Sequence, residues 1–139
     1  MTSPKPILIG TTNKGVLVSL KRDGRPQLSN INYAYDTTTR TVRISVTDDR
    51  AKTRNLRRDP RASLYVTSDD FWSYEVLEGT VTLSEVTTQP HDPAAEELVQ
   101  LYRDVAGEHS DWDEYRAAMI ADKRLVVRLT VEHVYGTAS

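Results

Sequence analysis

Cysteine is absent from this 139-residue chain. Without thiols the protein can form no disulfide, no cysteine-ligated metal site and no thiolate nucleophile, and this composition fits a reducing compartment. Long apolar runs are absent too, since no segment approaches the roughly 20 apolar residues of a membrane-spanning helix. The N-terminal apolar run has only three residues, Ile7 to Ile9, and is too short for a signal peptide. We therefore expect a cytoplasmic protein with no membrane partner.

An excess of either charge is also missing, because 18 basic and 20 acidic side chains leave a formal net charge of −2. Proteins that bind nucleic acids usually carry positive charge across the whole domain, so we expect no nucleic-acid partner. Hydrophobic residues make up 38% and charged residues 27% of the chain, as in ordinary globular proteins. The length then predicts a single domain over residues 1–139 with one core.

The motifs of several catalytic chemistries are absent. The three histidines, His91, His109 and His133, have no second ligand three or four residues away, so we expect no metal site. Residues 10–16 have the glycine spacing of a phosphate loop, but apolar residues replace the Lys-Ser/Thr pair that should follow. No G-x-S-x-G elbow is present. No catalytic residue can therefore be named, and an enzymatic activity would need a cofactor to carry the chemistry.

Alternating apolar and polar residues predict extended strands through much of the chain. In residues 41–47, Val42, Ile44 and Val46 alternate with polar residues, which is typical of a strand with one buried face. Gly79 predicts a bulge or bend in the long strand that contains it. The expected strands cover residues 14–21, 27–35, 41–47, 61–67, 72–83 and 124–134.

Two helices are expected late in the chain. Asp92 is a good N-cap before Pro93, and Gly107 should end the first of these helices. The second should run over residues 111–122 with Ser110 as its cap. Five or six antiparallel strands with two late helices predict an α+β fold in which the sheet closes into a barrel.

Residues 50–61 concentrate six of the 18 basic side chains of the protein. Asp48 or Asp49 would cap a short helix over the first part of this cluster. The free N–H groups at the start of such a helix, together with Arg50 and Lys52, would form a phosphate site. A basic helix that merely faces solvent is the alternative.

Segments in one collinear order between Gly15 and Gly136 are similar to those of a known family. They are residues 16–20 (VLVSL), 23–30 (DGRPQLSN), 50–56 (RAKTRNL), 72–74 (WSY), 78–79 (EG), 106–112 (AGEHSDW) and 133–136 (HVYG). They resemble the split-β-barrel flavin and deazaflavin binders, which include the pyridoxamine-phosphate-oxidase-like proteins. Within that family the best resemblance is to an actinobacterial subgroup of oxidoreductases that depend on coenzyme F420.

The resemblance implies a split β-barrel of the FMN-binding type that forms a homodimer, with two cofactor sites between the subunits. Arg50, Lys52 and Thr53 match the phosphate-binding positions of the family, and Asn55 follows close behind. Ser45 matches a polar contact near the side chain of the cofactor. Residue chemistry and resemblance thus both indicate a phosphate at the basic cluster.

Other matching positions lie near the ring of the cofactor. Gln27, Ser29 and Asn30 match polar positions along the isoalloxazine-like ring, and Trp72 and Tyr74 match aromatic residues of the neighbouring subunit. The alternatives are an ordinary strand surface for Ser29 and Asn30, and core or dimer packing for the two aromatic residues.

The resemblance implies a reductase that transfers a hydride between F420 and a conjugated small-molecule acceptor, such as an enone, quinone or tetrapyrrole. Water or a nearby tyrosine would supply the proton. The alternatives are an FMN-dependent oxidoreductase, a non-catalytic F420 carrier and a nucleic-acid binder with a local basic surface. Residues 1–10 are too short and proline-rich for the usual N-terminal helix of the family. Residues 136–139 lack the basic substrate segment of pyridoxamine phosphate oxidases, so we expect no vitamin B6 oxidation.

Overall fold

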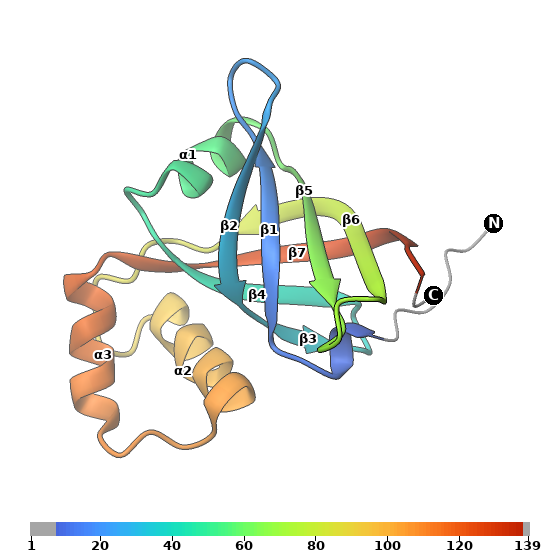
Figure 1. The fold of residues 1–139 in the computed structure, drawn as a ribbon. Coiled ribbons are helices and arrows are strands. Elements are labelled where there is room, and N and C mark those ends of the chain that lie inside the picture. The colour runs from blue at the N-terminus through green and yellow to red at the C-terminus, as the bar shows by residue number, and fades with distance from the viewer. Residues whose placement is uncertain (1–7, 138–139) are drawn as a thin grey trace.

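The computed structural model describes residues 8–137 (Figure 1). Expectations about residues 1–7, including the missing helix and signal peptide, lie outside this range. No helix within it is long and apolar enough to cross a membrane. A short 3₁₀-helix, η1 (Leu8–Gly10), comes first. The elements that follow are β1 (Lys14–Leu20), β2 (Pro26–Asn32), β3 (Ala34–Asp36), β4 (Thr41–Thr47), α1 (Ala51–Arg58), β5 (Arg61–Thr67), β6 (Tyr74–Leu83), α2 (Pro93–Ala106), α3 (Trp112–Ala121) and β7 (Arg124–Tyr135).

The strands form one seven-stranded antiparallel sheet with the order β2-β1-β5-β6-β7-β4-β3. β2 and β3 are consecutive in the chain but lie at the two ends of this order, so the sheet curls around a common interior (Figure 1). The register of β6 against β7 shifts between Glu78 and Gly79, which confirms the predicted bulge. A Cβ atom at Gly79 would lie 1.8 Å from the carbonyl oxygen of Thr130, so the close strand approach requires glycine. The structure confirms the α+β split barrel.

The predicted strand over residues 27–35 is in fact two strands, because the chain leaves the ladder at Tyr33. Tyr33 is buried, and its hydroxyl donates to the carbonyl oxygen of Ile9 at 2.6 Å. Burial and the nearby Glu75 carboxylate raise the pKa of Tyr33 above its usual range. Glu75 is buried as well and accepts hydrogen bonds from the backbone N–H groups of Leu8 at 2.9 Å and Ile9 at 3.1 Å. This tertiary contact breaks the strand and anchors η1 against the barrel.

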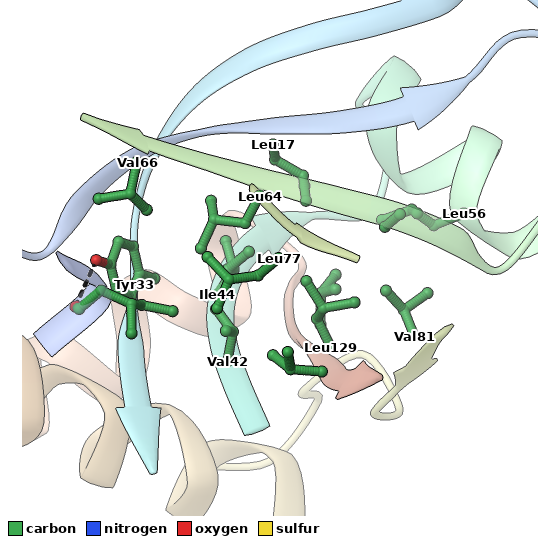
Figure 2. Close-up of a cluster of buried hydrophobic side chains, with 14 of the residues drawn as sticks. Leu17, Tyr33, Val42, Ile44, Leu56, Leu64, Val66, Leu77, Val81 and Leu129 are labelled. Atoms are coloured by element: carbon green, nitrogen blue, oxygen red, sulfur yellow. Dashed lines mark hydrogen bonds between the residues drawn. The ribbon is translucent and has the colours of Figure 1, made fainter. Parts of the chain in front are cut away.

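Apolar side chains from alternate strand positions fill the interior of the barrel. Val42 and Ile44 of β4 point inward, as their alternation with polar residues predicted. Figure 2 shows them packed with Leu64 of β5, Leu77 of β6 and Leu129 of β7. Burying each such side chain stabilises the fold by roughly 1.5–3 kcal/mol. The barrel interior is therefore the main source of stability.

The helices α2 and α3 form a second layer on one side of the barrel (Figure 1). α2 begins after Asp92, whose carboxylate accepts from the N–H of Ala95 at 2.7 Å, and ends at Gly107, as predicted. The cap of α3 is Asp111, whose carboxylate accepts a backbone N–H of the first turn, so the prediction of Ser110 is wrong by one residue. The contact between helices and sheet is a small apolar cluster of Ala34, Leu98, Leu101 and Val126.

The basic helix α1 begins after Arg50 without a side-chain cap. The prediction that Asp48 or Asp49 caps it is wrong because Arg50 occupies the N-cap position. The Asp48 carboxylate forms an ion pair with Arg57 at 2.6 Å, and the Asp49 carbonyl oxygen accepts from Arg54 at 2.7 Å. Within residues 8–137, no side chain therefore accepts from the N–H groups at the start of this helix.

Candidate functional site: a cationic cleft

A cleft of about 860 Å³ opens between the barrel and the α2–α3 layer. Its walls come from β1, β2, the ends of β4 and β5, the start of α1, the two late helices and the start of β7. The lining divides into a cationic and polar group and an apolar group, and none of the described residues that line it is a carboxylate. The cationic and polar group comprises Lys14, Asn30, Asn32, Ser45, Thr47, Arg50, Lys52, Thr67 and Arg124. The apolar and aromatic group comprises Gly15, Val16, Ile31, Val46, Leu101, Tyr102, Val105, Tyr115 and Met119.

Three cations gather because strand pairing brings the start of β7 to the start of α1. Arg124 pairs with Thr47 in the β4–β7 ladder, and the chain reaches Arg50 and Lys52 a few residues after Thr47. Among the ion pairs of the described chain, none involves these three cations. Burial, and then the charges of Arg50 and Arg124, lower the pKa of Lys52. A bound anion would relieve this repulsion.

The hydrogen-bonding capacity of the cationic group is only partly used. The Nη1 atom of Arg124 donates to the carbonyl oxygen and the Oγ of Ser45 at 3.4 and 3.5 Å, which are long distances. The Nε atom of Arg124 and the Oγ1 atom of Thr47 are buried and have no hydrogen-bond partner in the described chain. Buried polar atoms are normally paired, and leaving one unpaired costs about 1–3 kcal/mol. Together these atoms fit the oxygens of a phosphate or carboxylate.

An aromatic cluster fixes the apolar wall of the cleft. The rings of Tyr102, His109, Trp112 and Tyr115 lie with their centroids 5.0–5.7 Å apart, and most of the pairs are edge-to-face or tilted. The Tyr115 hydroxyl donates to the carbonyl oxygen of Leu98 at 3.0 Å, and burial raises the pKa of Tyr115 to about 12. No hydrogen bond to the Tyr102 hydroxyl occurs within the part of the chain that the structure describes. The cleft therefore joins an apolar aromatic wall to a group of cations.

Four of the predicted site residues line this cleft. They are Asn30, Ser45, Arg50 and Lys52, which come from three separate segments of the chain. Arg50 lies immediately before α1 and Lys52 lies in its first turn, where the basic cluster predicted a phosphate site. The predicted grouping of β2, β4 and the basic helix around one cavity thus appears in the structure.

Thr53 and Asn55 are buried in the framework behind the cleft. The Thr53 Oγ1 atom donates to the carbonyl oxygen of Thr47 at 2.7 Å and joins α1 to the end of β4. The Asn55 side chain donates to Ser19 Oγ at 3.4 Å and accepts from Arg58 at 3.0 Å. Both side chains therefore position α1, and neither lines the cavity.

Gln27 and Ser29 point away from the cleft. They pair across the β1–β2 ladder with Ser19 and Leu17, which are both buried, whereas Asn30 pairs with Val16 on the cleft side. Neighbouring residues of a strand point to opposite faces. Only Asn30 of this group therefore directs its side chain into the cleft.

Trp72 and Tyr74 also lie outside the lining of the cleft in their own subunit. The Trp72 side chain is 83% exposed, and the Tyr74 ring stacks on that of Tyr65 with the centroids 5.8 Å apart. In the strand ladders Tyr74 pairs with Thr67, which does line the cleft. Their assignment to the site of a neighbouring subunit stays a prediction.

The sequence did not identify Arg124, or the tyrosines Tyr102 and Tyr115 of the helical wall, as site residues. Arg124 begins β7, and its approach to Ser45 depends on the register of two strands about 80 residues apart in the chain. No local pattern reveals that register. The tyrosines follow the helical period of α2 and α3, which indicates a buried face but not the cavity beside it.

The chain resembles several known proteins over most of its length. The model of the family described as pyridoxamine 5'-phosphate oxidase matches residues 8–138. A conserved hypothetical protein from Mycobacterium tuberculosis is 20% identical with a TM-score of 0.73, covering 99% of this chain and 89% of that one. A structure described as an F420 reductase is 22% identical with a TM-score of 0.66, covering 92% and 93%. A haem-binding protein from Mycobacterium smegmatis is 22% identical with a TM-score of 0.67, covering 95% and 51%.

The structural likenesses cover most of the chain, and the family match covers every described residue. On these grounds the chain belongs to the pyridoxamine 5'-phosphate oxidase family, which is part of a superfamily of split-barrel oxidoreductases.

Proposed function

We propose that this protein is an F420-dependent oxidoreductase that exchanges a hydride between the deazaflavin and a conjugated small-molecule acceptor. The observation that carries the proposal is the joining of the Arg50, Lys52 and Arg124 cluster to an apolar wall in one cleft. A cofactor with a planar ring and a phosphate-bearing side chain needs both parts. The resemblance of the chain to F420-dependent proteins, and a similar structure described as an F420 reductase, support the choice of cofactor.

In this proposal Arg50, Lys52 and Arg124 hold the phosphate through charge-assisted hydrogen bonds, with free N–H groups of α1 beside them. Asn30 and Ser45 supply polar contacts along the rest of the cofactor. When bound, the deazaflavin supplies the hydride. The chain contributes orientation and exclusion of water by its aromatic wall.

The proton that accompanies the hydride has two sources in this cleft. Water is one. The Tyr102 hydroxyl is the other, because it lines the cavity and has no hydrogen bond within residues 8–137. Tyr115 is poorly suited, since its hydroxyl already donates to Leu98 and its pKa is raised to about 12.

We also propose that the protein acts as a homodimer. The Leu28 side chain on β2 is apolar and 59% exposed. Phe71 and Trp72, in the β5–β6 turn, are 71% and 83% exposed. Exposed apolar surface of this kind is commonly an interface, and a twofold dimer is the commonest soluble assembly. Sedimentation should show a dimer at micromolar concentration, and a monomer that still binds cofactor would contradict a site between subunits.

Parallel titrations with F420 and FMN, followed by tryptophan fluorescence, test the cofactor. We expect F420 to bind at least tenfold tighter, and equal or reversed affinities would favour the FMN-dependent alternative. Oxidation of reduced F420 by a panel of enones and quinones then separates an enzyme from a carrier. A carrier would bind F420 without turnover.

The haem-binding neighbour raises a different cofactor class, but the cleft is poorly equipped for it. Histidine is the commonest axial ligand of haem iron. None of the described residues that line the cleft is a histidine. The cationic group and the apolar wall therefore favour a phosphate-bearing cofactor over haem.

A further inference from the structure

The helix α1 has a second basic side, which faces away from the cleft. Ala51, Arg54, Asn55 and Arg58 recur at the i, i+3, i+4 and i+7 spacing and so share one side of the helix. This side borders a cavity of about 430 Å³, here called the hairpin pocket, beside the turn between β1 and β2. Its other lining residues are Lys21, Arg22 and Asp23. The hairpin pocket and the cationic cleft have no lining residue in common.

Neutral acceptors hold the two guanidinium groups of the hairpin pocket in place. Arg54 donates to the carbonyl oxygen of Asp49 at 2.7 Å. Arg58 donates to the carbonyl oxygen of Leu20 at 2.7 Å and to the side-chain oxygen of Asn55 at 3.0 Å. These bonds fix the position of each guanidinium. Neither forms an ion pair among the described residues, although Arg58, after Arg61, contributes to lowering the pKa of the Asp59 carboxyl.

The opposite wall of the pocket is basic as well. Neither Lys21 nor Arg22 forms an ion pair with any residue in the described range. The only carboxylate in the described lining is that of Asp23, and one of its oxygens accepts the backbone N–H of Arg25 at 3.0 Å. The turn itself is closed by a hydrogen bond from the N–H of Gly24 to the carbonyl oxygen of Lys21 at 3.0 Å. The fixed guanidinium groups of α1 and the basic side chains of the turn therefore line one pocket.

Lys21, Arg22, Arg54 and Arg58 are exposed, so solvent screens their repulsion, and an anion between the two walls would relieve what remains. Like charges four residues apart on a helix destabilise it, and like charges across a cavity add to that repulsion. Arg57, on another side of the same helix, has a carboxylate that offsets its charge, because it forms an ion pair with Asp48 at 2.6 Å. The basic side chains of the hairpin pocket form no such ion pair among the described residues, although the protein has a net charge of −2.

We propose that the hairpin pocket binds an oxyanion, a phosphate or carboxylate group, between Arg54 and Arg58 on one side and Lys21 and Arg22 on the other. This second site does not depend on which cofactor occupies the cleft. The oxyanion belongs either to a free anion or to the distal end of a ligand that starts in the cleft and passes the first turn of α1.

Titration of the protein with inorganic phosphate, followed by NMR of the arginine Nε–Hε groups, tests the site. We expect saturable shifts at Arg54 and Arg58. Affinity at these groups should fall at least tenfold in Arg54→Ala and in Arg22→Ala. Arg57→Ala is the matched control, since it removes one charge from the same helix outside the pocket, and it should leave the affinity unchanged.

Repeating the titration at saturating F420 identifies the source of the oxyanion. Shifts at Arg54 and Arg58 caused by F420 itself, with loss of phosphate binding there, would show a ligand that spans both sites. Undiminished phosphate binding would show a free anion. The proposal is overturned if the wild-type protein shows no saturable shifts at Arg54 and Arg58, or if Arg57→Ala weakens binding as much as Arg54→Ala does. The wild-type phosphate titration fails or succeeds independently of F420 binding.

Discussion

The barrel interior and the cationic cleft treat buried polar groups in opposite ways. Inside the barrel, Glu75 accepts two backbone N–H groups and the Tyr33 hydroxyl donates to a carbonyl oxygen. In the cleft, the Nε atom of Arg124 and the Oγ1 atom of Thr47 are buried without a partner among the described residues. Native proteins leave few buried polar groups unpaired, and each exception calls for an explanation. In our proposal a ligand supplies the missing partners in the cleft, whereas Glu75 and Tyr33 already have theirs within the barrel.

The strongest way to disturb the first region is to remove a side chain from its centre. Leu77 is fully buried in the barrel cluster (Figure 2). We expect Leu77→Ala to lower the free energy of unfolding by about 2–5 kcal/mol, because it removes apolar contacts and leaves a cavity. Urea unfolding followed by circular dichroism measures the loss. A loss below about 1 kcal/mol would mean that the barrel interior is not the source of stability.

A mutation in the cleft should have the opposite signature. Lys52→Ala removes a cation that Arg50 and Arg124 already crowd, so the free energy of unfolding should change by less than about 0.5 kcal/mol. Affinity for F420 should fall about ten- to a hundredfold, because a charge-assisted hydrogen bond contributes about 1.5–3 kcal/mol.

Arg57→Ala is the control for Lys52→Ala, because Arg57 pairs with Asp48 and does not line the cleft. It should bind F420 like the wild type. Equal losses in the two variants, with a steep dependence of polynucleotide binding on salt, would instead favour a nucleic-acid surface.

Thr53 lies at the border between the two regions and sharpens the comparison. The resemblance places it among phosphate-binding positions, whereas its Oγ1 atom donates to the Thr47 carbonyl oxygen. If that bond is its main role, Thr53→Val should cost about 1 kcal/mol of stability and weaken F420 binding less than Lys52→Ala does. Thermal unfolding and the F420 titration of the two variants decide. A loss of F420 affinity as large as that of Lys52→Ala would mean that Thr53 contributes directly to cofactor binding.

Local patterns predicted those parts of the fold that depend on local physics. The alternation around Ile44 reflects the period of a strand. Asp92 and Gly107 bound α2 because an aspartate side chain can cap the first turn and glycine readily adopts the positive φ found at the helix end. Gly79 revealed a bulge because glycine alone permits a close strand approach. The break at Tyr33 depends on contacts with Ile9, and no pattern within the strand predicts it.

The candidate site was predicted in part for the same reason. Arg50 and Lys52 belong to one continuous basic segment, so composition was enough to single them out. Arg124 joins them only through the β4–β7 register, which composition does not encode. Ser29 and Asn30 point to opposite faces, as adjacent residues of a strand do, so only Asn30 directs its side chain into the cleft, and a contact of Ser29 with a ring stays a prediction.

The uncapped start of α1 would couple binding of the proposed ligand to the thermal stability of the protein. A ligand oxygen that accepts the free N–H groups there would act as the missing cap, and it would do so only in the folded state. By mass action, a ligand at a hundred times its dissociation constant adds about 2.7 kcal/mol to the stability of the fold that binds it. The bound phosphate would thus stabilise α1, the helix that binds it. The melting temperature of the protein would then rise with the fraction of molecules that carry the cofactor.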